Sequence, residues 1–214
     1  MLFGPPDTQV DLFKIALERL GVARALVLGH SWGASVAVAL AFNCPDLVKG
    51  LVLASGYYYP TPRFDVIALS APAIPVVGDV ASFTLSPLVS RLMWPLMMLE
   101  IFGPRSVPNK FAGFPKEMAL RPSQIRASAA ESAMMIPDAF RFRQEYSKLK
   151  MPVAIIAGEN DRLIDIDEQS ARLHKDIPQS TFSRVSETGH MVHQTATNVV
   201  MNAIDEVARS TSPG

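Results

Sequence analysis

The segment from residue 25 to residue 54 constrains the fold more than any other part of this 214-residue chain. Residues 25–28 are short and wholly apolar, which is typical of a strand buried on both faces of a sheet. The turn Gly-His-Ser-Trp-Gly follows at 29–33, and residues 34–42 are apolar nearly all round, as in a buried helix. Residues 48–54 form a second apolar strand. A strand, a helix and a strand in this order predict a βαβ unit and hence a parallel sheet.

The turn at 29–33 has the spacing G-x-S-x-G, in which a serine stands on a sharp turn between a strand and a helix. Such a turn is crowded two residues before and two residues after the serine, so we expect Gly29 and Gly33 to be required. Ser31 would expose its hydroxyl above the sheet as a nucleophile. The helix behind it would aim the backbone N–H of Trp32 at an oxyanion. His30 is expected to pack in the pocket wall with its hydrogen bond satisfied, rather than to act as a second base.

The composition excludes several other classes of protein. Hydrophobic residues make up 49% of the chain and charged residues 19%, which excludes a disordered chain. The 20 basic and 20 acidic residues balance, which argues against a nucleic-acid partner. Cys44 is the single cysteine, so neither a disulfide framework nor a cysteine-based zinc site is expected. No group of His, Asp and Glu has ligand spacing, so we expect no metal and no cofactor.

The sequence gives no sign of a targeting segment or a membrane span. Residues 1–6 contain neither a basic region nor an apolar run. The most apolar stretch, residues 88–102, is interrupted by Arg91, Pro95 and Glu100 and is shorter than the ~20 residues that a span needs. We therefore expect no integral membrane segment and a cytoplasmic protein.

A serine nucleophile needs a base, and the base needs an acid that orients it. Where a serine stands on such a turn, the acid and then the histidine follow it in chain order. Residues 152–157 form a third apolar strand, and Gly-Glu-Asn-Asp-Arg comes directly after it. Asp161 is the stronger prediction for the acid, and Glu159 is the alternative.

The base is expected in the loop after the last strand, which is predicted at residues 180–185. The pair Gly189-His190 lies in that loop, so His190 is the predicted base. His193 is expected to face the start of the final helix, predicted at 197–208. The remaining helices are predicted at 8–20 and 168–175.

With these three motifs in order, each after an apolar strand, the sequence resembles the α/β-hydrolase superfamily, and within it the esterase- and lipase-like members with a serine nucleophile. The resemblance implies a mainly parallel sheet flanked by helices, with Ser31 as nucleophile, His190 as general base and Asp161 as orienting acid. It also implies cleavage of small carboxylic esters, with apolar acyl or alkyl groups, through a covalent acyl-enzyme. Acyltransferases, carbon–carbon hydrolases and haloperoxidases that use the same three residues are the alternatives.

Residues 57–150 stand where this superfamily inserts a helical cap, and they contain no clean strand. The expected organisation is therefore core at 1–56, cap at 57–150 and core again at 151–214. Because methionine is flexible and polarizable, a methionine-rich cap favours an adaptable apolar pocket, and we expect Tyr57, Met93 and Met97 to line it. Packing within the cap itself is an equally good explanation of the methionines.

The chain departs from the superfamily before its first strand. Full-length members have several strands ahead of the nucleophile strand, whereas residues 1–23 here provide a single helix. A sheet of the four predicted strands leaves residues 25–28 at an apolar edge, which native proteins normally cover. We therefore expect a partial fold from a longer hydrolase, with a naturally short variant or an inactive fragment as alternatives. Trp32 is the single predicted oxyanion donor.

Overall fold

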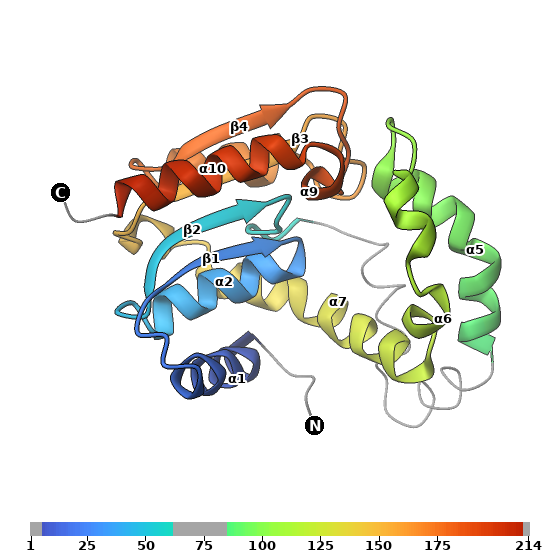
Figure 1. The fold of residues 1–214 in the computed structure, drawn as a ribbon, viewed down its shortest axis with the longest axis horizontal. Coiled ribbons are helices and arrows are strands. Elements are labelled where there is room, and N and C mark those ends of the chain that lie inside the picture. The colour runs from blue at the N-terminus through green and yellow to red at the C-terminus, as the bar shows by residue number, and fades with distance from the viewer. Residues whose placement is uncertain (1–5, 62–84, 212–214) are drawn as a thin grey trace.

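The computed structural model describes residues 6–61 and 85–211, and its core is one sheet of four parallel strands in the order β1-β2-β3-β4 (Figure 1). The strands are β1 (Ala25–His30), β2 (Val48–Ala54), β3 (Val153–Gly158) and β4 (Thr181–Val185). One row of paired residues crosses the whole sheet, from Leu28 to Val52, Ala154 and Thr181. Because all strands are parallel, the loops that follow them meet at one edge of the sheet, as the sequence predicted.

The helices surround this sheet. They are α1 (Pro6–Arg19), α2 (Trp32–Asn43), α5 (Leu85–Phe102), α6 (Lys116–Ala119), α7 (Pro122–Phe142), α8 (Arg172–Asp176), α9 (Val192–Thr195) and α10 (Thr197–Ser210). Two 3-10 turns, η2 (Asn109–Gly113) and η3 (Tyr146–Lys148), and a π-helical turn, η4 (Asp167–Ala171), complete them. The predicted helices at 8–20, 34–42 and 197–208 are found as α1, α2 and α10. The helix predicted at 168–175 is divided between η4 and α8.

The two central strands are apolar at every position in their middle because helices cover both faces of the sheet. On one face, Leu51, Leu53 and Ile155 pack with residues of α2 and α8. On the other face, alternating residues such as Val52 and Ile156 pack with α9 and α10. The core therefore lies on both sides of β2 and β3, and the predicted α/β fold class is confirmed.

The strand β1 lies at the edge of the sheet, as the sequence predicted. In the described ranges no strand pairs with its outer side, and the Leu28 side chain is 41% exposed. The expectation that residues 25–28 are buried on both faces is therefore wrong. The helix α1 packs on α2 but buries only part of its apolar residues: Val10 is buried, whereas Phe13 is 51% exposed.

The described residues between β2 and β3 form helices and no strand. In Figure 1, α5 and α6 lie beyond the carboxyl ends of the strands, and α7 leads from them back towards α2. Within residues 6–61 and 85–211, no helix combines the length and apolar character that crossing a bilayer requires.

Candidate active site

Ser31 occupies a strained turn between β1 and α2. Its φ is 53° and its ψ is −122°, a conformation that L-residues rarely adopt. The turn is fixed from both sides, since the Ser31 N–H donates to the Ala54 carbonyl at 2.9 Å and the Ser31 carbonyl accepts from the Ala34 N–H at 3.0 Å. Its hydroxyl makes no hydrogen bond to any described residue, so it is available for chemistry.

The crowding expected around this turn is found at Gly29 and not at Gly33. A Cβ atom at Gly29 would lie 2.3 Å from the Gly33 carbonyl oxygen, a backbone atom that cannot move aside freely. Apart from its chain neighbours and the backbone of its own helix, a Cβ atom at Gly33 would meet no atom of the described residues within 4 Å. The reason proposed from the sequence therefore holds for the first glycine of the motif only.

The backbone N–H of Trp32 has no acceptor among the described residues. Trp32 is the first residue of α2, so its N–H has no acceptor within the helix, and no described residue outside the helix accepts from it. The N-terminus of this 12-residue helix also carries partial positive charge. This donor lies directly after the serine, where negative charge would develop.

Asp161 lies in the loop after β3 and is held by two kinds of contact. Its Oδ1 accepts backbone N–H groups from Leu163 at 2.9 Å and Ile164 at 3.0 Å. Its Oδ2 lies 2.8 Å from Nδ1 of His190, and the two side chains are only 1% and 6% exposed. Glu159, the alternative acid, is exposed. The structure thus brings together the predicted acid and base.

The loop that carries His190 can approach the sheet because of two glycines. A Cβ at Gly158 would lie 2.3 Å from the Gly189 carbonyl oxygen, and one at Gly189 would lie 2.0 Å from that of Gly103. The Met191 N–H donates to the Ile101 carbonyl at 3.1 Å, which ties the loop to the end of α5. The carboxylate acceptor at Nδ1 selects the tautomer in which Nε2 of His190 carries no proton.

Two further histidines lie close to His190. Nε2 of His30 lies 2.9 Å from the His190 carbonyl oxygen and donates to it, so the hydrogen bond expected for His30 is present. The ring of His193 lies 4.2 Å from that of His30, between centroids, whereas the sequence predicted that it would face the final helix. The turn that places His193 is α9, which no sequence pattern had indicated.

Both histidines are held neutral at ordinary pH. Burial, followed by the nearby His190 and His193, lowers the pKa of His30 to about 3. Burial, followed by His190 and Lys110, also lowers the pKa of His193. A neutral His30 can donate from Nε2 to the His190 carbonyl without adding a second positive charge beside the base.

We expect His30 to make stability depend on pH. Because its folded pKa lies below the ordinary value of about 6.5, the unfolded chain takes up this proton first as pH falls. The unfolding free energy should therefore drop by about 2 kcal/mol between pH 7 and pH 5 through this group. His30→Gln keeps an N–H donor but cannot titrate, so urea melts at both pH values should show a smaller drop.

His174→Gln is the matched control, since His174 lies on α8 and bonds Ser180 Oγ instead. Equal pH dependence in the parent protein and in His30→Gln would contradict this prediction.

Among the described residues, no hydrogen bond or ring contact joins the other predicted pocket residues to Ser31. Tyr57 is buried and packs with Ala139 and Ile164, and its hydroxyl bonds the backbone of Thr61. Met93 and Met97 are 46% and 43% exposed on α5. A cavity of about 350 Å³ opens on the same helix, and it is lined instead by the large side chains Trp94, Met98, Phe111 and Phe114. Because helical periodicity alone did not show which face of α5 is covered, the sequence could not separate these positions.

Comparison with known proteins decides the family. A sequence model of the alpha/beta hydrolase fold matches residues 6–197. The chain belongs to this family. It is 26% identical over 183 residues to the uncharacterized hydrolase YugF of Bacillus subtilis (strain 168), covering 82% of this chain and 62% of that protein. It is 24% identical over 197 residues to a 2-hydroxy-6-oxononadienedioate/2-hydroxy-6-oxononatrienedioate hydrolase of Paraburkholderia phymatum, covering 86% and 62%.

The fold agrees with solved structures of this family. A thermophilic esterase from Thermogutta terrifontis superposes with a TM-score of 0.69 at 18% identity, covering 98% of this chain and 74% of the esterase. The two curated relatives in the previous paragraph are each covered to 62%, so the chain spans less than two thirds of their length.

Proposed function

We propose that this protein is a serine hydrolase that cleaves carboxylic esters, with Ser31 as nucleophile, His190 as general base and Asp161 as the acid that orients it. The observation that carries the proposal is the buried 2.8 Å contact between Asp161 and His190, whose carbonyl oxygen accepts a hydrogen bond from His30, the residue before Ser31. The family's hydrolases support the reaction class. The esterase among the structural neighbours shows only that the fold is compatible with the ester chemistry proposed here.

The proposed reaction uses the same groups in both halves. Nε2 of His190 takes the proton of the Ser31 hydroxyl while Oγ attacks the ester carbonyl carbon, and the oxyanion accepts the Trp32 N–H. The alcohol leaves with the proton from His190, and the acyl group stays on Ser31. Water then gives a proton to His190 and attacks the acyl carbon. The bond between that carbon and Ser31 Oγ breaks, and His190 returns its proton to Oγ, which releases the acid and restores Ser31. Asp161 holds the Nδ1–H tautomer throughout.

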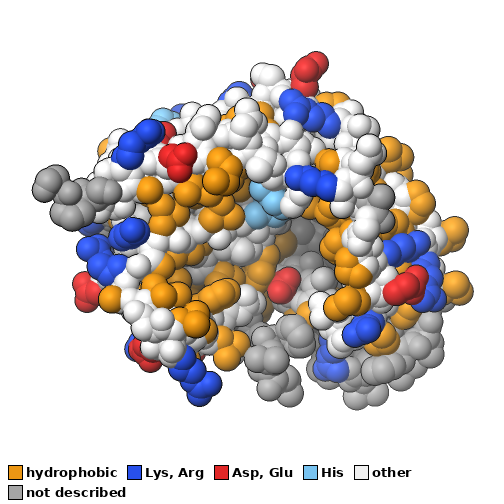
Figure 2. Space-filling model, in the orientation of Figure 1, with side chains coloured by type: hydrophobic (Ala, Val, Ile, Leu, Met, Phe, Trp, Pro, Cys, Tyr) orange, Lys and Arg blue, Asp and Glu red, His pale blue; other side chains and the backbone are white. Residues whose placement is uncertain are grey.

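We also propose that residues 57–150 act as a cap over this site, between core segments 1–56 and 151–214; of these ranges, residues 1–5, 62–84 and 212–214 lie outside the described residues. The support is local: the His190 loop contacts the end of α5 through Met191 and Gly189. Figure 2 shows histidine side chains on the wall of a hollow between the sheet and the helices of this insert. A helical cover at this place would exclude water and shape an apolar pocket.

A fluorophosphonate probe tests the nucleophile directly, because it reacts only with an activated serine. We expect the 214-residue chain to be labelled at Ser31, and Ser31→Ala to remain unlabelled. Ser35→Ala is the matched control, since Ser35 lies on the helix α2 that follows Ser31 and its hydroxyl bonds the Tyr57 carbonyl. No labelling of folded protein, or equal labelling of Ser31→Ala, would contradict the proposal and favour an inactive hydrolase-like fragment.

Carbon–carbon bond hydrolysis is the second candidate, and the Paraburkholderia phymatum relative favours it by its name. A p-nitrophenyl ester and a vinylogous 1,5-diketone acid, offered separately, distinguish the two reactions by their products. Faster turnover of the ester is the expected result.

Addition of a competing alcohol separates hydrolysis from acyl transfer, because a transferase would form the new ester.

A further inference from the structure

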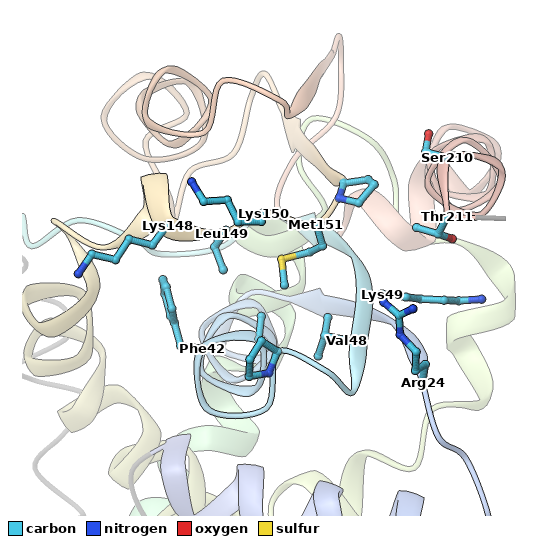
Figure 3. A pocket seen from close by; sticks show the side chains of 13 residues that line it. Arg24, Phe42, Val48, Lys49, Lys148, Leu149, Lys150, Met151, Ser210 and Thr211 are labelled. Atoms are coloured by element: carbon cyan, nitrogen blue, oxygen red, sulfur yellow. The ribbon is translucent and has the colours of Figure 1, made fainter. Parts of the chain in front are cut away.

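A second cavity lies at the end of the sheet opposite to Ser31. Its volume is about 550 Å³, and it is lined by residues that precede β1 and β3, that begin β2 and that end α2 and α10 (Figure 3). The proposed catalytic residues, in contrast, follow the carboxyl ends of β1, β3 and β4. Strands of six or seven residues separate the two places by roughly 20 Å, so a ligand here would not touch Ser31.

The lining of this cavity is positively charged. Arg24, Lys49, Lys148 and Lys150 line it, and no Asp or Glu is among its lining residues. In Figure 3, Lys148 and Lys150 stand on one side and Arg24 and Lys49 on the other. The chain as a whole has zero net charge, so these basic residues are unevenly distributed over it. A cavity lined by positive charge attracts anions.

Local contacts explain two of these four cations but not the other two. Lys148 pairs with Glu145, and Nζ of Lys150 donates to the Ser147 carbonyl at 3.2 Å. Arg24 and Lys49 form no ion pair and no hydrogen bond with any described residue. The C-termini of α2 and α10 also lie at this cavity, and each carries about half a negative charge. Together the two helix ends therefore offset less charge than the side chains of Arg24 and Lys49 carry. These two groups therefore keep unused capacity for an anion.

Between the two groups of cations the cavity wall is apolar. Phe42, Val48 and Met151 contribute side chains there, and Figure 3 shows Met151 and Val48 between the two sides and Phe42 beside Lys148. The volume lies within the range of about 300–1,000 Å³ that is usual for small-molecule sites. An apolar wall beside a free guanidinium and a free ammonium matches a ligand with an apolar body and an anionic head.

We propose that this cavity binds an amphipathic organic anion, whose carboxylate or phosphate head is held by Arg24 and Lys49 and whose apolar body lies over Phe42, Val48 and Met151. The guanidinium fork can hold two oxygens of either head group, and the ammonium adds a third donor. This site is independent of the proposed hydrolase reaction, because it uses none of its residues.

Titration calorimetry with four probes tests the chemistry of the ligand. Decanoate and decyl phosphate carry both features, decanol carries only the apolar body, and inorganic phosphate carries only the charge. We expect decanoate or decyl phosphate to bind at least about tenfold more tightly than the two partial probes. The head group that binds more tightly identifies the source as a carboxylate or a phosphate ester. Equal binding of decanol, or no binding of either anion, would overturn the proposal.

Variants then assign the binding to this cavity. The double variant Arg24→Gln/Lys49→Gln should weaken the anion at least about tenfold, whereas Arg24→Lys/Lys49→Arg should retain most of the affinity. Lys175→Gln, on α8 outside the cavity, is the matched control and should bind like the parent. Unchanged binding in the double glutamine variant would overturn the proposal. Fluorophosphonate labelling of the same variant should equal that of the parent, so failure here and failure of the hydrolase proposal are distinguishable.

Discussion

Asp161→Asn is expected to lower kcat for ester hydrolysis by about 10⁴-fold while the protein stays folded. The asparagine Oδ1 can still accept the backbone N–H groups of Leu163 and Ile164, as the aspartate does. Its amide nitrogen then faces Nδ1 of His190, which must become an acceptor. The proton moves to Nε2, and the base that Ser31 needs is lost. The expected fall in rate therefore comes from the wrong tautomer rather than from a collapsed loop.

The same chain offers a matched control a few residues away. Asp165 Oδ1 accepts the backbone N–H groups of Asp167 and Glu168 at 2.9 Å each, two and three residues ahead, as Asp161 does. Asp165 makes no contact with a histidine among the described residues. Asp165→Asn should therefore leave kcat within about twofold of the parent, because the substitution affects only an exposed turn.

The tautomer can be read without any turnover. Nitrogen NMR of labelled histidine should show Nδ1 protonated in the parent and Nε2 protonated in Asp161→Asn. A large loss of activity with an unchanged His190 tautomer would contradict the proposed role of Asp161. Activity equal to that of the parent would contradict the proposed mechanism as a whole.

The sequence predicted those parts of the fold that depend on local pattern. The strand at 48–54 and the apolar helix after Ser31 were found nearly at their predicted limits. Helices cover both faces of the central sheet, so burial alone explains why these segments are apolar. The edge position of β1 also followed from the number and order of the strands. The exposure of Leu28 and Phe13 did not, because an apolar residue does not indicate whether a neighbour is present to cover it.

The site was predicted unevenly for a related reason. Asp161 and His190 could be found because each follows a strand, and topology brings the ends of parallel strands together. The placement of His193 against His30 depends on the short turn α9, whose four residues carry no periodic pattern. The anion cavity was missed because its residues come from five separate segments, and no spacing along the chain joins them.

Gly29→Ala and Gly33→Ala form the second pair with a large expected difference, although the two glycines are equivalent in the motif. The methyl group at position 29 would lie 2.3 Å from the Gly33 carbonyl oxygen, so the Ser31 turn must open. We expect the unfolding free energy to fall by about 1–3 kcal/mol or more, as for other overpacked sites. A nucleophile displaced by about 1 Å should also cost on the order of 10²-fold in rate.

Gly33→Ala should behave in the opposite way. The new methyl group meets no atom within 4 Å, and Gly33 lies in the first turn of α2 with no positive φ to relieve. Alanine in a helix is favoured over glycine by about 0.5–1 kcal/mol, so urea melts should show equal or higher stability. Fluorophosphonate labelling at fixed time should be retained in Gly33→Ala and nearly lost in Gly29→Ala. Equal losses of labelling in both variants would contradict this prediction. They would mean that Gly33 is required for access of the probe to Ser31, and that steric crowding does not explain the glycine at that position.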